Sequence, residues 1–186
     1  MEEKPPDDCA IEVNYVLGKK PFLLTRIAST GPFQDAIDFD SDGNLTITYH
    51  GKEAHRFAIS FRLPEGDESG GFAGIKAWPE GGRKPEQFIL PGRGVTILLP
   101  GTSLDLHAYT TTPEIDPDKV TLLSIGDAFS ERGTYYYCLG MYQTNNRNED
   151  NIVEDDPRIY NNGDPGSGER PGCLHLLFGS RRGGRR

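Results

Sequence analysis

Four histidines are the residues of this sequence best suited to acid–base or metal chemistry. His50 and His55 flank a short turn, and His107 and His175 follow later in the chain. Imidazole rings that converge with a carboxylate on a β scaffold bind zinc or iron. The chain has no HxH pair and no HExxH motif, so we expect surface or capping histidines. An enzyme pocket lined by His50, His55 and His107, our catalytic candidates, is the alternative.

An acidic turn offers a different kind of metal chemistry. Asp38, Asp40 and Asp42 are followed by Gly43, as in the first half of a calcium loop, where alternate side chains converge on one cation. The twelfth position, where a bidentate glutamate closes such a loop, is Tyr49. The same residues predict a β-hairpin, because an Asp-Gly pair allows the positive φ of a tight turn. We expect the hairpin, with a weak calcium site as the alternative.

Four aromatic residues with polar neighbours are candidates for ligand binding: Trp78, Tyr109, Tyr142 and Tyr160. If they cluster, such rings stack on sugars or bind a peptide. The competing interpretation is that these side chains complete the hydrophobic core, as aromatic residues commonly do.

Three cysteines, Cys9, Cys138 and Cys173, form no metal-binding pattern because the chain has no CxxC motif. Their odd number, together with an N-terminus that lacks the basic-then-apolar layout of a secretory signal, predicts reduced thiols and a cytoplasmic protein. A Cys138–Cys173 disulfide is the alternative for an exported chain.

The charge distribution narrows the range of partners. The chain carries 20 basic and 28 acidic side chains, and four of the basic ones are arginines within residues 181–186. The rest of the chain therefore has a formal charge of −12, with 16 basic against 28 acidic side chains, and would repel the phosphates of duplex nucleic acid. We expect residues 179–186 to be a disordered basic tail. No run approaches the ~18 apolar residues of a membrane span.

Short runs of alternating polar and apolar residues predict the elements that position these side chains. The runs are separated by turn residues, among them 23 glycines and 14 prolines, and occupy residues 10–16, 22–27, 44–50, 55–63, 86–90, 94–99, 103–109, 119–125, 133–142 and 173–178. Period-two alternation indicates β-strands, and the chain has no long amphipathic helical pattern. We predict an all-β protein of about ten short strands, a single antiparallel β-sandwich of jelly-roll or immunoglobulin-like type spanning residues 1–178.

Two polar segments interrupt these strands. We expect residues 64–74 to form a flexible rim, and residues 145–172 to form a long acidic loop that contains a short edge strand near residues 152–160. Loops on a rigid sandwich commonly carry ligand contacts. We therefore expect a non-catalytic binding or interaction module for a carbohydrate or protein ligand. The alternatives are an enzyme on a jelly-roll or barrel scaffold and a self-assembling structural protein.

Overall fold

The computed structural model describes residues 7–14, 22–51, 55–66, 71–92, 95–109, 119–129, 132–142 and 152–163. These residues form twelve β-strands and one 3-10 helix, η1 (Gln34–Ala36), with no α-helix among them. The strands are β1 (Cys9–Asn14), β2 (Leu23–Ile27), β3 (Ile37–Phe39), β4 (Leu45–Tyr49), β5 (Phe57–Arg62), β6 (Phe72–Pro79), β7 (Thr96–Leu98), β8 (Leu104–Tyr109), β9 (Leu122–Asp127), β10 (Gly133–Tyr142), β11 (Ile152–Asp155) and β12 (Arg158–Gly163). The predicted all-β fold class is confirmed.

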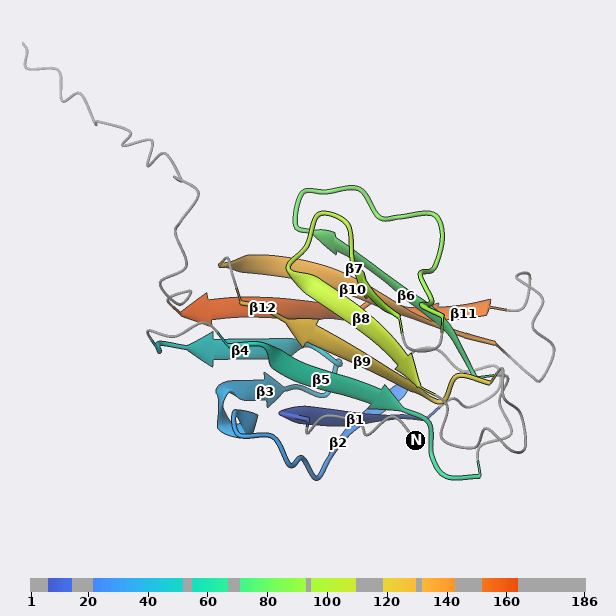
Figure 1. The fold of residues 1–186 in the computed structure, drawn as a ribbon, viewed down its shortest axis with the longest axis horizontal. Helices are drawn as coiled ribbons and strands as arrows, with labels where there is room; N and C mark the ends of the chain where they lie inside the picture. The colour runs from blue at the N-terminus through green and yellow to red at the C-terminus, as the bar shows by residue number, and fades with distance from the viewer. Residues whose placement is uncertain are drawn as a thin grey trace, which may run out of the picture.

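The strands form two mixed sheets. The first sheet has the order β2-β1-β5-β9-β8-β7, and the second has the order β11-β10-β12-β4-β3, with β6 along the other edge of β10. Figure 1 shows β12, from the end of the described chain, beside β10. Two strand pairs, β1–β5 and β12–β4, are parallel, so the sheets are not wholly antiparallel as predicted. Parallel partners need a long crossover, and here the chain visits the opposite sheet between the two strands of each pair.

One hydrophobic core contains residues of both sheets. Ile59 and Phe61 of β5 and Tyr137 and Leu139 of β10 are fully buried in it. The rings of Phe61 and Tyr137 lie 5.3 Å apart between centroids and connect the two sheets. Because side chains alternate along a strand, the intervening residues of β10 point to the outer face of the second sheet.

The expected strands agree with the structure at most positions. The predicted strand 133–142 coincides with β10 at both ends. The predicted strand 86–90 is not a strand, but Ile89 forms an isolated bridge with Ile75 of β6. The predicted strand 173–178 and the basic tail lie outside the described residues.

Two of the predicted loops contain strand residues. Residues 72–74, placed at the end of the 64–74 loop, begin β6, which the sequence did not predict. Within the predicted 145–172 loop, residues 152–155 and 158–163 form β11 and β12. β12 was expected at an edge, but it lies between β10 and β4.

A search of the described residues for a helix long and apolar enough to cross a membrane finds none.

Candidate binding face on the second sheet

Two of the four aromatic candidates lie on the same outward face of the second sheet. Trp78 is in β6 and Tyr160 is in β12, on either side of β10. Trp78 pairs directly with Tyr136 of β10. Tyr160 pairs with Thr134, which lies two residues before Tyr136 on β10. Residues two apart in a strand point to the same face, so Trp78, Tyr136 and Tyr160 share this face.

The other two aromatic candidates lie elsewhere. Tyr142 is the last residue of β10, about 20 Å along the strand from Tyr136 at ~3.3 Å per residue. Tyr109 is the last residue of β8 in the first sheet, and its side chain is outside the described part of the structure. The structure therefore brings Trp78 and Tyr160 together and leaves Tyr142 apart.

Aromatic and cationic side chains stack across the strands of this face. The rings of Trp78 and Tyr136 lie 5.5 Å apart between centroids with an interplanar angle of 15°. The Arg158 guanidinium carbon lies 4.8 Å from the Tyr136 ring centroid, and the Lys84 Nζ lies 5.5 Å from that of Trp78. We call these four side chains, Lys84, Trp78, Tyr136 and Arg158, the stacked row. Each contact contributes about 0.5–1 kcal/mol, so the row holds its rings in a defined orientation.

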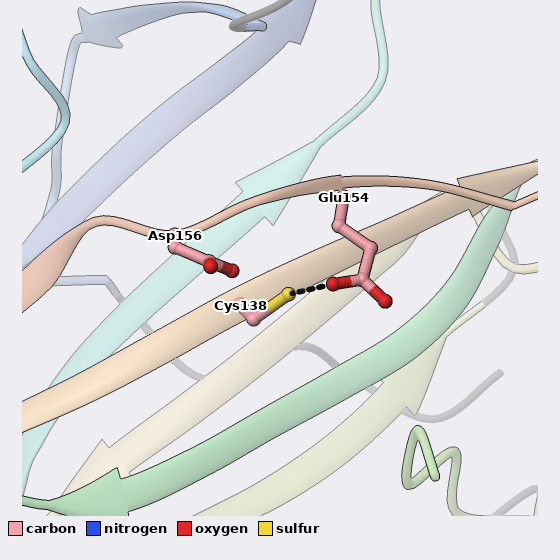
Figure 2. Close-up of side chains that lie close together, drawn as sticks. All are labelled: Cys138, Glu154 and Asp156. Carbon is pink, nitrogen blue, oxygen red and sulfur yellow. Dashed lines mark hydrogen bonds between the residues drawn. The ribbon is translucent and has the colours of Figure 1, made fainter. Parts of the chain in front are cut away.

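A cluster of a thiol and two carboxylates adjoins the stacked row. Figure 2 shows Cys138 of β10, Glu154 of β11 and Asp156 just after it, with the Cys138 Sγ donating a 3.6 Å hydrogen bond to Glu154 Oε2. The Lys84 Nζ lies 2.9 Å from Glu154 Oε2 and 2.9 Å from Asp156 Oδ2. The Lys76 Nζ, from β6, lies 3.1 Å from Glu154 Oε1. The two lysines thus neutralise the two carboxylates.

The surroundings fix the charge states in this cluster. Burial alone would raise the pKa of Glu154, but hydrogen bonds from Lys84 and Lys76 lower it to about 2. Burial, followed by the hydrogen bond with Asp156, raises the pKa of the Cys138 thiol. Burial would lower the pKa of Lys84, and its hydrogen bonds with Asp156 and Glu154 outweigh that effect and raise it. At neutral pH the thiol is therefore protonated and is a poor nucleophile.

The ligand atoms of this cluster are spaced as in a metal site, but their present partners and protonation do not suit a metal ion. Ligand atoms of Cys138, Glu154 and Asp156 lie within 4.8 Å of one another, the only such group of three or more in the described ranges. The ammonium of Lys84 contacts both carboxylates, and the thiol keeps its proton. A cation would have to displace the lysine and ionise the thiol, so we assign the cluster a structural role.

A segment between β6 and β7 covers this part of the outer face. We call residues 80–92 the strap; Figure 1 shows it looping beyond β6. Ile89 exchanges backbone hydrogen bonds of 2.8 and 3.0 Å with Ile75, and the Phe88 ring centroid lies 4.2 Å from the Lys76 Nζ. Phe88 also fills the space above Gly140, where an added Cβ would lie 2.6 Å from its ring. Lys76 is buried beneath the Phe88 ring, and Cys138 is buried beside Glu154, although both side chains point outward.

The three described histidine candidates lie in different surroundings. His50 is exposed just after β4. His55 packs against Phe33, with ring centroids 4.1 Å apart. His107 is buried on β8, where its Nδ1 lies 3.1 Å from the Thr96 hydroxyl. None of the three belongs to a group of metal-ligating residues in the described part of the chain, and His175 lies outside it.

The acidic turn adopts the hairpin geometry. β3 and β4 pair in antiparallel register, and Gly43 has a φ of 84°. The Asp40 carboxylate accepts 2.9 Å hydrogen bonds from the backbone N–H groups of Asp42 and Asn44 and from the Asn44 side chain. Slight burial would raise the pKa of Asp40, and these hydrogen bonds lower it. Asp38, Asp40 and Asp42 form no group of converging ligands among the described residues.

The sequence interpretation missed three functional candidates, Lys84, Tyr136 and Arg158. A usable signal existed for Tyr136, because it alternates with the core residues of a strand that was predicted correctly. Cys138 and Cys9 are free thiols in the structure, and Cys173 lies outside the described residues. In comparisons with known proteins, no family model matches the chain and no curated protein is similar enough to match it.

Proposed function

We propose that this protein is a non-catalytic binding module that recognises a partner protein through the outer face of its second sheet. The residues assigned to recognition are Trp78, Tyr136, Arg158 and Tyr160. The sequence hypothesis placed ligand contacts on loops, whereas this proposal places them on a sheet face. A sandwich of jelly-roll or immunoglobulin-like type remains the finer fold assignment that we favour for this module.

The observation that carries the proposal is the stacked row. Trp, Tyr and Arg are the residues most enriched among the energetic hot spots of protein interfaces. Trp78 and Tyr136 are half-buried, and each already packs against its neighbour. A partner therefore meets side chains whose rotamers are restrained before binding, which lowers the entropic cost of association.

The orientation of the rings favours a protein over a carbohydrate. Stacking on a sugar needs a free ring face. The Tyr136 ring lies between Trp78 and Arg158, which are its direct partners on the two neighbouring strands. The Trp78 ring is stacked on Tyr136, and the Lys84 Nζ lies 5.5 Å from its centroid. The row therefore offers ring edges, the tyrosine hydroxyls and the guanidinium, which suit side chains and backbone groups of a peptide.

Trp78 makes the proposal testable because it is the only tryptophan in the chain. Peptides selected from a display library against the full chain would be titrated while the tryptophan emission is recorded. We expect selected peptides to shift this emission, and Tyr136→Ala to weaken their binding at least tenfold, as for a hot-spot residue. Tyr142→Ala, on the same strand but outside the row, is the matched control.

Two outcomes would contradict the proposal. One is a set of peptides whose affinity is equal for the wild type and Tyr136→Ala. The other is a glycan array on which the wild type binds defined sugars while no peptide is selected, which would favour a carbohydrate ligand instead.

A further inference from the structure

The basic side chains on and over the outer face differ in whether a carboxylate is paired with them. Lys76 and Lys84 are paired with Glu154 at 3.1 and 2.9 Å, and Arg83 of the strap is paired with Glu86 at 2.9 Å. Arg158 has no carboxylate within ion-pair distance among the described residues; Glu80 adds only a weak attraction from further away. Of these four side chains, Arg158 is therefore the one whose charge is left for a ligand.

Arg158 is nevertheless held in place. Its guanidinium lies 4.8 Å from the centroid of the Tyr136 ring and donates a hydrogen bond to the Tyr160 side chain. The side chain is exposed on β12, an interior strand. An arginine stacked on a ring keeps its remaining in-plane N–H donors directed away from that ring, in the fork arrangement that matches a planar anion.

We infer that Arg158 is the anion-recognition residue of the proposed binding face and that it takes a carboxylate of the partner peptide. This inference rests on the proposed function, because it names the group that the same face recognises. The aromatic part of the row would pack against neighbouring side chains of the peptide, and the guanidinium would pair with an aspartate, a glutamate or a terminal carboxylate.

The surroundings favour a carboxylate over a phosphate. Phosphate sites in proteins gather several cations or backbone N–H groups around one dianion. Here the lysine of the stacked row, Lys84, is already bound to Glu154 and Asp156, and Glu80 adds further negative charge near Arg158. A single unpaired guanidinium in this setting matches a group with one negative charge.

Small probes test the inference directly. N-acetyl-glutamate amide, N-acetyl-glutamine amide and inorganic phosphate would be titrated into the full chain labelled with nitrogen-15. The readouts are the Arg158 Nε–H resonance and the Trp78 indole N–H resonance. We expect saturable shifts with the glutamate probe, with a dissociation constant of about 1–10 mM, as befits so small a molecule. The glutamine probe should bind at least tenfold more weakly, and phosphate more weakly than glutamate.

Variants separate recognition from structure. Arg158→Gln should abolish the glutamate-dependent shifts, and Arg158→Lys should not restore them, because an ammonium lacks the planar fork. Arg83→Gln, which removes an exposed but paired arginine, is the matched control and should leave the shifts unchanged. Equal binding of the two amides, tighter binding of phosphate, or loss of binding in Arg83→Gln would overturn the inference.

A last comparison distinguishes this inference from the proposed function. A selected peptide and its version with every Asp, every Glu and the C-terminal carboxyl group amidated would be titrated into the wild type and Tyr136→Ala. If both versions bind the wild type equally and both fail on Tyr136→Ala, the binding face stands and the role of Arg158 falls. If neither version depends on Tyr136, the proposed function itself falls.

Discussion

Glu154 forms two of the ion pairs on the outer face. It binds the ammonium groups of Lys76 and Lys84 through different oxygens. Replacing it with glutamine leaves Lys76, whose side chain is 7% exposed, without a carboxylate. Breaking a buried pair costs about 3–5 kcal/mol, but Glu154 is 35% exposed, so we expect Glu154→Gln to lower the free energy of unfolding by about 1–3 kcal/mol in urea titrations at pH 7.

The control for this substitution is the double variant Lys76→Met with Glu154→Gln, which removes the stranded charge and should regain part of the loss. The effect also has a pH window. Folding lowers the pKa of Glu154 from its ordinary value of 4.5 to about 2, so its stabilisation is present above pH 4.5 and is lost as the pH falls toward 2. A difference between wild type and variant that stays constant over this range would contradict the assignment.

At the scale of elements, the strap is the segment that decides what the outer face exposes. Gly140 leaves the space that the Phe88 ring occupies, since an added Cβ would lie 2.6 Å from that ring. We expect Gly140→Val to push Phe88 aside and displace the strap, whose Lys84 holds Glu154 against the Cys138 thiol, and so to expose this thiol, which is fully buried in the wild type. In a background with Cys9→Ala and Cys173→Ser, which leaves Cys138 as the single thiol, the rate of labelling by an aromatic disulfide reagent should rise at least tenfold, because exposure controls thiol reactivity.

Phe88→Ala provides the control, because it removes the ring that packs the strap onto Gly140 and Lys76 without adding bulk to β10. It should raise the labelling rate as Gly140→Val does. Equal labelling rates for the wild type and both variants would show that the strap does not protect Cys138.

The strap also explains which elements the sequence predicted and which it did not. β10 was predicted with correct ends because its aromatic-rich run begins at Gly133 and ends before the polar residues that follow Tyr142. β6 was missed because Gly74 and Lys76, on its outer side, are buried beneath the strap, so the strand is covered on both faces and shows no period-two pattern. Its partner segment at Ile89 was predicted as a strand, but only one residue pairs.

Only part of the candidate site could be predicted from the sequence, because the rest depends on which strands are neighbours. Trp78 and Tyr160 were identified by residue type. Their connection through Tyr136 and Arg158 depends on the register of β6, β10 and β12, which come from distant parts of the chain. Alternation predicts which face a residue occupies, but it carries no information about which strand lies next to it.

At the scale of the whole molecule, Asp127 is a buried carboxyl group that lies between the two sheets, near Asn161 of the second sheet. This residue of β9 is fully buried, and its Oδ1 accepts 2.9 Å hydrogen bonds from the Ser103 hydroxyl and the Phe129 N–H. Asn161, which belongs to β12 in the opposite sheet, is buried near the same carboxyl group, but its amide atoms and the Asp127 Oδ2 make no hydrogen bond within the described structure. Burial raises the pKa of Asp127, and these polar neighbours offset only part of that effect. The folded chain therefore holds the Asp127 proton more tightly than the unfolded chain does.

The pH dependence of Asp127 should therefore run opposite to that of Glu154. A carboxyl group whose pKa is raised by folding stabilises the fold below its unfolded pKa, near 3.8, and loses this contribution as the pH rises through the folded value. Asp127→Asn keeps an oxygen for Ser103 and Phe129 but has no proton to lose. We expect the wild type to lose stability relative to this variant between pH 4 and neutrality, by at most about 1.4 kcal/mol per pH unit, in urea titrations at several pH values. The prediction is contradicted if the wild type instead gains stability relative to Asp127→Asn over this pH range. That result would mean that the fold stabilises the ionised carboxylate, which would require a positive charge near Asp127.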